Sequence, residues 1–419
     1  MTAADPQQTI AAVWRIEAAK LIAALSRIVR DVGIAEELAQ DALVAALEQW
    51  PQDGVPDNPG AWLMATAKHR AIDKLRRDEL LQRKHAELAH ELESVLGEAN
   101  VNAEAALDDP FGDDVLRLVF TACHPVLSSE ARTALTLRLL GGLTTDEIAR
   151  AFLVPESTIA QRIVRAKRTL SEAEVPFEVP HGAEMTQRLC SVLEVIYLIF
   201  NEGYTATAGA DWMRPQLCEE ALRLGRILAG LMPDEAEVQG LIALMELQAS
   251  RMHARTGPNG EPILLLKQNR ARWDQLLIHR GLKTLARAER LGGSRQRYTL
   301  QAAIAACHAR ARNADETDWP CIAQLYAELA KVAPSPVVEL NCAVAVSMAQ
   351  GPAAGLALVD ALFAEPALGS YHLLPTVRGD LLEKLGRKDE ARMEFERAAA
   401  LTRNAREREL LLARAAGCD

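Results

Sequence analysis

The sequence predicts an all-α protein built from three helical blocks. Apolar residues recur at three- and four-residue spacing along most of the 419 residues, Ala and Leu dominate, and no convincing run alternates apolar and polar residues as a strand does. Aromatic residues make up only 4% of the chain, so the cores must consist mainly of Leu, Ala, Val and Ile. At roughly 150 residues per domain, the length suggests two or three domains.

Changes in composition divide the chain. The first block covers residues 10–84, and the second covers 115–172. Between them lies an acidic linker, residues 85–114, with nine acidic residues and no Lys or Arg. A stretch containing Pro176, Pro180 and Gly182 separates the second block from a third, residues 184–419. Such breaks in helical patterning are typical of boundaries between domains.

The bulk composition excludes several classes of protein. The longest strong apolar run, residues 195–200, is far shorter than the roughly 18 residues of a membrane helix. The N-terminus lacks the pattern of a signal peptide. The seven cysteines form no C-x-x-C pair, which favours reduced thiols over disulfides or zinc. We therefore expect a cytoplasmic protein without a membrane partner.

Motifs for catalysis are missing from the sequence. It contains no G-x-S-x-G elbow, no phosphate-binding glycine loop and no H-E-x-x-H. His85 and His90 flank Glu87, but a separation of five residues does not place both imidazoles on one helix face. We therefore predict no enzymatic activity, no catalytic residue, no cofactor and no metal site.

Taken over the whole chain, the net charge of −10 argues against nucleic-acid binding, which usually needs a basic surface. However, the acidic linker alone carries −9, and residues 1–181 together also sum to −9. The remainder of residues 1–181 is therefore neutral overall. Each of the two flanking blocks contains a local basic cluster, one between Lys68 and Arg77 and one between Arg162 and Arg168.

The second basic cluster lies on a predicted helix-turn-helix. Helices are expected at about residues 145–152 and 156–170, joined by a short turn through Pro155. The residues expected to pack the two helices together are apolar: Ile148, Ala149, Ile159 and Ile163. Polar and basic side chains then face outward along the second helix, where they can reach base edges and phosphates. The alternative is a helical hairpin with a solvated basic face.

The first block contains two further helices of interest. Residues 35–50 form an amphipathic helix with acids and amides on one side, and residues 58–77 form a basic helix that carries Trp62 near its start. A basic helix beside an aromatic ring suits single-stranded DNA, because cations hold phosphates and bases stack on the ring. For Trp62 itself, a role as a buried core anchor is the favoured interpretation.

In this order, the three features resemble the extracytoplasmic-function (ECF) sigma factors of the sigma-70 superfamily. Residues 35–41 resemble the helix that binds the polymerase clamp, residues 62–77 the helix that contacts the −10 element, and residues 143–170 the domain that reads the −35 element. The resemblance covers about residues 10–172, so we call 10–84 the region 2 block and 115–172 the region 4 block. It implies two sigma domains, with core RNA polymerase (β′ clamp and β flap) and promoter DNA as partners.

The resemblance assigns candidate binding residues in three sets. The polymerase set is Glu36, Glu37, Leu38, Gln40 and Asp41. The −10 set is Trp62, Lys68, His69, Arg70, Asp73, Lys74, Arg76 and Arg77. The −35 set is Glu156, Ser157, Thr158, Gln161, Arg162, Arg165 and Lys167. Three positions depart from the family pattern, namely Leu43, His69 and Pro155, and they put in doubt which bases are read.

The resemblance also implies that the acidic linker threads toward the active centre of the polymerase, where nine negative charges would suit a basic channel. A solvated flexible tether is the alternative. A basic stretch, residues 263–297, carries net charge +7 and could dock on that linker, with Arg280, Lys283 and Arg287 as the test positions. A solvated face is the default interpretation of this stretch.

The third block is longer than a two-domain sigma factor requires. Residues 378–404 match the spacing of a tetratricopeptide repeat at Gly379, Leu382, Gly386, Ala391, Phe395 and Ala398. Residues 340–358 look like a degenerate second copy. This spacing resembles the sigma-factor subgroup with a C-terminal tetratricopeptide-like domain, and the resemblance implies a peptide or protein partner. A packing scaffold is the alternative.

Residues 197–204 end an apolar helix and either line a pocket or form a cap at Gly203.

The sequence therefore predicts a sigma factor with two helical sigma domains, an acidic linker and a regulatory helical-repeat domain. The competing hypothesis is a helix-turn-helix transcriptional regulator with a tetratricopeptide sensor, which would bind DNA without replacing sigma. The helices at residues 35–50 and 58–77 favour the first hypothesis, because an ordinary regulator has no need of them.

Overall fold

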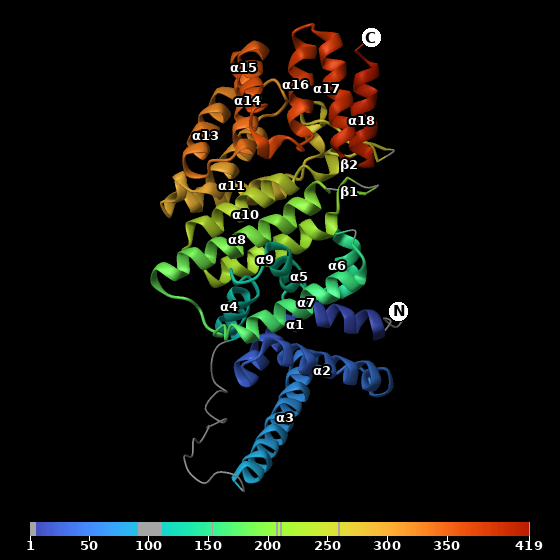
Figure 1. Cartoon of the computed structure of the whole chain (residues 1–419), viewed down its shortest axis with the longest axis vertical. Coiled ribbons are helices and arrows are strands. Elements are labelled where there is room, and N and C mark those ends of the chain that lie inside the picture. Colours follow the sequence, from blue (N-terminus) through green and yellow to red (C-terminus); the bar gives the residue numbers. More distant parts are fainter. Residues whose placement is uncertain are drawn as a thin grey trace. The chain divides into compact units, whose positions relative to one another are not determined.

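The structure is a computed structural model that describes residues 6–90, 111–152, 154–206, 208–209, 212–258 and 260–418. Its described residues are predominantly helical (Figure 1), which confirms the predicted all-α class. The chain divides into two compact units, Met1–Val195 and Ile196–Asp419, called here the N-terminal and C-terminal units. None of the described helices combines the length and apolarity needed to cross a membrane.

The helices described in the first 172 residues belong to the N-terminal unit. They are α1 (Pro6–Val29), α2 (Val32–Asp53), α3 (Pro59–His90), α4 (Phe111–Ala122), α5 (Ser129–Leu139), α6 (Thr145–Phe152) and α7 (Glu156–Glu172). Helix α1 packs against α2 and α3 of the region 2 block and also against α4, while α2 contacts α7. The region 2 and region 4 blocks are thus packed on each other in one unit.

Local sequence signals explain where these helices begin and end. Asp31 caps α2, since its Oδ1 accepts a hydrogen bond from the backbone N–H of Ile34 at 2.8 Å. Gly54 follows the same helix with a φ of +88°, a conformation that favours glycine. Ser128 caps α5 by accepting from the N–H of Ala131 at 3.3 Å. Short-range hydrogen bonds and backbone conformation therefore account for these helix ends.

Helix α8 (Gly182–Tyr204) belongs to both units. The first part of the C-terminal unit adds α9 (Pro215–Leu231), α10 (Ala236–Ala249), η2 (Met252–Ala254), η3 (Leu265–Lys267), η4 (Arg270–Arg272), α11 (Gln275–Arg290), η5 (Gly293–Arg295) and α12 (Arg297–Arg310). Helix α10 buries twelve of its fourteen residues, because it packs against α9, α11 and α12. At Gly240, a Cβ atom would lie 2.4 Å from Oγ1 of Thr299, so this helix crossing requires glycine.

The second part of the C-terminal unit is a series of helical hairpins (Figure 1). It contains α13 (Trp319–Val332), α14 (Pro336–Gln350), α15 (Pro352–Leu362), η6 (Pro366–Leu368), α16 (Leu373–Lys384), α17 (Lys388–Leu401) and α18 (Ala405–Ala416). In the α16–α17 hairpin, a Cβ at Gly379 would lie 2.7 Å from Cε1 of the fully buried Phe395. Two-residue strands β1 (Ala208–Gly209) and β2 (Arg403–Asn404) pair in parallel.

Candidate nucleic-acid and polymerase interface

The helix-turn-helix forms where the sequence predicts it. Thr144 and Glu147 make a reciprocal capping box at the start of α6: the Thr144 N–H donates to Glu147 Oε2 at 2.8 Å, and the Glu147 N–H donates to Thr144 Oγ1 at 3.1 Å. Pro155 stands at the N-cap of α7, and its carbonyl accepts from the Thr158 N–H at 2.9 Å. The two helices are therefore started by separate signals on either side of a short turn.

The packing faces of the two helices are also as predicted. Ile148, Ala149, Ile159 and Ile163 are all buried, at 0%, 3%, 1% and 6% exposure. On the opposite side of α7, Glu156, Ser157, Gln161 and Arg165 are exposed, while Thr158 and Arg162 are half-buried. Six members of the predicted −35 set therefore remain accessible to a ligand such as duplex DNA, along one side of a supported helix.

Lys167, the seventh member of the −35 set, is engaged inside the N-terminal unit. Its Nζ contacts Oε2 of Glu36, a residue of the predicted polymerase set on α2. The other oxygen of the same carboxylate, Oε1, accepts from Nε of Arg138 on α5 at 2.6 Å. Glu36 is only 2% exposed. One buried carboxylate thus joins the region 2 block to two helices of the region 4 block, and we call these three residues the Glu36 clasp.

The rest of the predicted polymerase set is divided by burial. Glu37 and Asp41 are exposed, Gln40 is half-buried and donates through Nε2 to Glu36, and Leu38 is buried at 6% exposure. The alternation follows from the helix: residues on the core side of α2 pack inward, and those on the other side meet solvent. The carboxylates of Glu37 and Asp41 are therefore both exposed on this face.

The predicted −10 set lies along α3. Trp62 is half-buried and meets the buried Trp50 edge to face, with ring centroids 5.4 Å apart. Arg70 forms an ion pair with Asp41 at 3.7 Å, and Arg77 donates through Nε to the Asp73 carbonyl at 3.1 Å. The other members are exposed or half-buried: Lys68, His69, Asp73, Lys74 and Arg76. This helix therefore offers several cations to solvent.

A second buried carboxylate lies between the two blocks, and sequence reasoning missed it. The sequence composition places Asp114 in the acidic linker, but in the structure it lies on α4, on the region 4 side of the interface, and is only 2% exposed. Its Oδ2 lies 3.3 Å from Nε of Arg27 on α1, and its Oδ1 accepts from Nη1 of Arg117 at 2.6 Å. The spacing of Asp114 and Arg117 fits a helical pair, but the contact with Arg27 spans too much sequence to be read from a pattern.

Helix α8 is fastened to the region 4 block by two buried polar side chains. Arg188, 5% exposed, donates through Nη2 to the Phe120 carbonyl at 3.0 Å. Ser191 donates through Oγ to the Cys123 carbonyl at 2.6 Å. Arg132 also lies 3.5 Å from Glu194. The chain that follows the helix-turn-helix is therefore anchored to it before entering the C-terminal unit.

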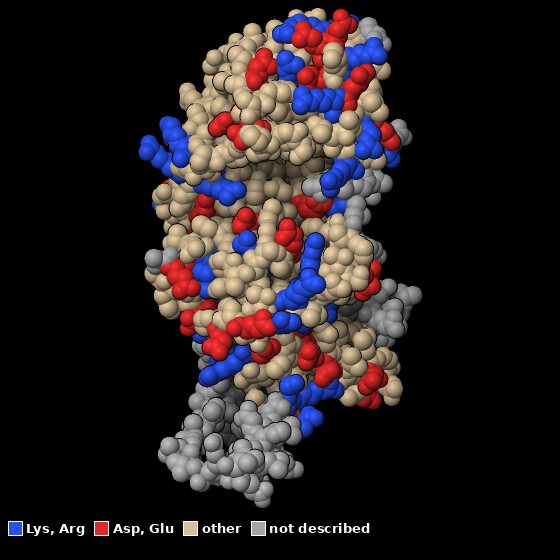
Figure 2. All heavy atoms as spheres, in the orientation of Figure 1, with Lys and Arg blue, Asp and Glu red and all other residues tan. Residues whose placement is uncertain are grey.

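Both signs of charge are interspersed over the face shown in Figure 2. Within the basic stretch, three arginines already have local partners. Arg280 pairs with the buried Glu246 at 3.2 Å, and Arg287 lies 3.8 Å from Asp234. Arg270 is itself buried and donates to the Ala311 carbonyl at 2.9 Å. The sequence pattern did not predict these local contacts. Residues 91–110 of the acidic linker, and with them the predicted docking on the basic stretch, lie outside the described residues.

All seven cysteines are free thiols. Burial raises the pKa of Cys123 to about 11 and that of Cys218 to about 12, so neither is a reactive thiolate at neutral pH. In the part of the chain that the structure describes, no group of three His, Cys, Asp or Glu side chains is placed to hold a metal ion. The side chains of His85 and His90 are not among the described ones.

Comparison with known families matches three segments of the chain. Residues 15–80 match sigma-70 region 2, and residues 117–170 match sigma-70 region 4. Residues 188–289 match a family of unknown function, DUF6596. The first two matches fall on α1–α3 and α4–α7, and the third begins at the arginine that anchors α8.

Individual relatives agree with these matches. The chain is 44% identical to the uncharacterized protein R00370 of Rhizobium meliloti over 385 residues, which cover 92% of this chain and 90% of that protein. It is 30% identical to the ECF RNA polymerase sigma factor SigK of Mycobacterium ulcerans over 152 residues, or 35% of this chain and 75% of SigK. It is 26% identical to the probable ECF sigma factor SigI of Mycobacterium tuberculosis over 181 residues, 43% of this chain and 59% of SigI.

Proposed function

Because the chain belongs to the ECF RNA polymerase sigma factors of the sigma-70 family, we propose that it directs core polymerase to a promoter and that its C-terminal unit regulates this activity. The observation that carries the proposal is the exposed face of α7 on a well-formed helix-turn-helix, preceded in the same chain by a region 2 block. An ordinary DNA-binding regulator has no use for the region 2 block. The proposed location is the cytoplasm, where the polymerase acts.

The proposed reading of the −35 element uses the front of α7. Ser157, Gln161 and Arg165 are exposed there, and amide and guanidinium groups can form paired hydrogen bonds to bases in the major groove. Arg162 and Arg165 would also neutralise phosphates. The −10 element would be bound along α3, where His69, Arg76 and Arg77 face solvent.

The Glu36 clasp gives the proposal a conformational step. Glu36 and Lys167 belong to different candidate binding sets, yet in the packed N-terminal unit they form an ion pair with each other. We propose that the described arrangement is the closed form of the protein. Polymerase and promoter binding would then require the region 2 and region 4 blocks to separate, which exposes Glu36 toward the clamp and Lys167 toward DNA.

The helical hairpins of the C-terminal unit support a role in binding a regulatory partner. Gly379 lets α16 approach Phe395 closely, and the turn residue Gly386 has a φ of +75°, a conformation that favours glycine. Stacked hairpins of this kind present extended surfaces that commonly bind peptides. We propose that such a partner modulates the opening of the N-terminal unit.

Run-off transcription with purified core polymerase tests the central proposal. The full chain should produce a promoter-specific transcript, and Arg165→Ala should reduce it by about fivefold or more, since one base or phosphate contact contributes on the order of 1–3 kcal/mol. Arg168→Ala is the matched control, because Arg168 lies on the same helix, outside the predicted −35 set, and pairs with Glu172 at 2.7 Å. DNA binding without any transcript from core polymerase would instead support the regulator hypothesis.

A further inference from the structure

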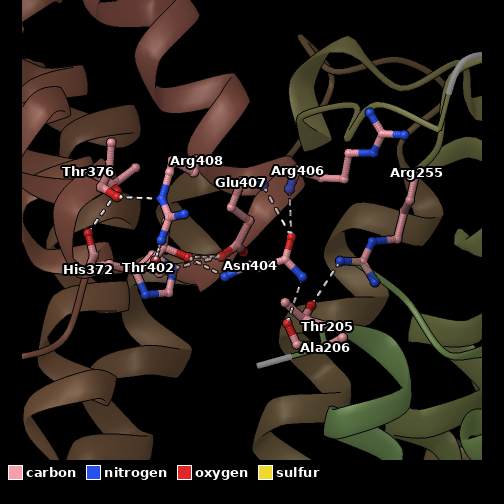
Figure 3. A network of polar contacts seen from close by, with 11 residues as sticks. Thr205, Ala206, Arg255, His372, Thr376, Thr402, Asn404, Arg406, Glu407 and Arg408 are labelled. Atoms are coloured by element: carbon pink, nitrogen blue, oxygen red, sulfur yellow. Dashed lines mark hydrogen bonds and ion pairs between the residues drawn. The ribbon is translucent and has the colours of Figure 1, made fainter. Parts of the chain in front are cut away.

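A cavity of about 220 Å³ lies within the C-terminal unit, between the segment that follows α10 and helices α16 and α18. Apolar side chains form much of its wall, among them Trp212, Leu264, Leu373 and Leu411. Arg251, Arg255, His372 and Glu407 provide its charged and titratable groups. Figure 3 shows the last three of these residues together with the polar network beside the cavity.

Arg255 is an unusually placed cation. It is only 5% exposed, and its guanidinium carbon lies 3.5 Å from the ring centroid of Tyr204 and 4.3 Å from that of Trp212. The guanidinium donates to the Tyr204 carbonyl and, at 3.1 Å, to Thr205 Oγ1. Burial lowers the pKa of Arg255 to about 10, which still leaves it charged at neutral pH. The aromatic rings therefore hold a permanent positive charge at the cavity wall.

Arg251 places a second guanidinium nearby. Its Nε donates to Tyr204 Oη at 3.0 Å, so both arginines use the same tyrosine, one on its hydroxyl and the other on its ring face. Among the described residues, no carboxylate lies within ion-pair distance of Arg251 or Arg255. Two like charges held together in a partly apolar site are costly without a counter-ion.

The carboxylate of Glu407 also lines the cavity but is already engaged. Its Oε2 lies 3.2 Å from Nε2 of His372 and accepts from Thr402 Oγ1 at 2.9 Å. Burial alone would raise the pKa of Glu407, but the hydrogen bonds and charges of His372, Thr402 and Arg255 outweigh it and lower that pKa overall. With one ionised carboxylate against two guanidinium groups, the cavity wall retains an excess of positive charge.

We propose that this cavity binds a small carboxylate with a short apolar chain. The carboxylate would lie against Arg251 and Arg255, whose planar guanidinium groups match its geometry. The apolar chain would pack on Leu264, Leu373 and Leu411. The cavity is smaller than the 300 Å³ or more typical of drug-sized ligands, which limits the occupant to on the order of ten non-hydrogen atoms. Either a free carboxylic acid or the last residue of a peptide has this chemistry.

Such a ligand would bridge two distant parts of the chain. The arginines and Trp212 come from one part, and Leu373, His372 and Glu407 come from the hairpins. The same two parts meet beside the cavity in the β1–β2 pair, where Asn404 donates through Nδ2 to the Ala206 carbonyl at 3.2 Å (Figure 3). Because a ligand that binds only the folded state stabilises it by mass action, occupancy should tighten this junction.

The test is a calorimetric titration of the full chain with matched acids and amides. The free-acid arm uses isovalerate and isovaleramide, and the peptide arm uses acetyl-Gly-Gly-Leu with a free or an amidated C-terminus. We expect an acid to bind with a Kd between about 10 μM and a few mM, the range reached by ligands of this size, and its amide to bind at least tenfold more weakly. The arm that binds more tightly identifies the source of the ligand.

Variants locate the binding to the cavity. Arg251→Gln should weaken acid binding at least tenfold, and Arg251→Lys should weaken it less. Arg272→Gln is the matched control, since Arg272 is exposed and does not line the cavity. Leu373→Trp should block the cavity without removing a charge, because Leu373 is 37% exposed at its wall. The proposal would be overturned by an amide that binds as tightly as its acid, or by an unchanged Kd in Arg251→Gln. It would also be overturned if the folded chain bound no acid at concentrations 20-fold above the expected Kd range.

Discussion

The interface between the two sigma blocks and the packing inside the α16–α17 hairpin of the C-terminal unit are built from different groups. Between α2 and α7, and between α1 and α4, the chain buries the carboxylates of Glu36 and Asp114 against cations. Between α16 and α17, it buries Phe395 against Gly379. Separating charged partners returns them to water and recovers hydration, whereas separating apolar partners recovers nothing comparable. The difference indicates an interface that can open in the first case and a permanent one in the second.

The surroundings of two buried glutamates, Glu246 and Glu36, show the same contrast. Glu246 of the C-terminal unit is 1% exposed and lies 2.9 Å from Arg226 and 3.2 Å from Arg280, a clamp much like that of Glu36. However, Glu246 stands on α10, whose neighbours bury nearly all of it within one core. Glu36 joins two blocks that each contain helices of their own. A similar ion pair can therefore serve either as part of a core or as a clasp.

The largest expected effect comes from breaking the apolar interface. Phe395→Ala should lower the free energy of unfolding by about 3–5 kcal/mol, because it leaves a cavity at a fully buried site. Urea unfolding of the full chain, followed by circular dichroism, measures this loss. Met393→Ala on the same helix is the matched control: Met393 is 68% exposed, and its truncation should change stability by less than about 0.5 kcal/mol. Equal effects of the two variants would contradict the described core.

An intermediate effect is expected from acid, which acts on the C-terminal unit through His308. Burial, followed by the charges of Arg251 and Arg270, lowers the pKa of His308 to about 3. Since the folded state binds this proton more weakly than the unfolded state does, stability is complete above about pH 6.5 and falls toward pH 3 by about 1.4 kcal/mol per pH unit.

Thermal unfolding between pH 7 and pH 4.5 measures this slope. His308→Gln should flatten the part of the slope that belongs to the C-terminal unit, while His253→Gln, at an exposed position, should leave it unchanged. If His308→Gln retained the full pH dependence, the imidazole of His308 would not be its cause.

The smallest effect is expected at the Glu36 clasp. Glu36→Gln removes the charge that holds Lys167 and Arg138, but both cations are 21% exposed in their side chains and can be hydrated. We therefore expect a loss of only about 1–2 kcal/mol in the closed form, equivalent to roughly tenfold faster opening of the contact between α2 and α7. Hydrogen exchange of the amides of α2 and α7 measures it.

Glu37→Gln is the matched control for the clasp, since it removes the neighbouring exposed charge. Its amide exchange should equal that of the unaltered chain. If Glu36→Gln left exchange in both helices unchanged, the Glu36 clasp would not hold the blocks together, and the comparison with the hairpins would lose its basis.

The all-α class, the helix-turn-helix and its packing face follow from local patterns in the sequence. These depend on short-range signals, such as the Thr144–Glu147 capping box and the spacing of Ile159 and Ile163, which act within a few residues. The order of the two sigma blocks was also readable, because each carries its own local motif.

Which of the candidate residues are accessible depends on contacts between distant parts of the chain. Glu36 and Lys167 read as surface residues on their own helices, yet they meet across 131 positions of sequence, which buries Glu36 and leaves Lys167 half-buried. The cavity of Arg251 and Arg255 likewise depends on hairpins that follow more than 100 residues later. Helical periodicity states which side of a helix is polar, but whether another polar side covers it is set by long-range packing, which no local pattern encodes.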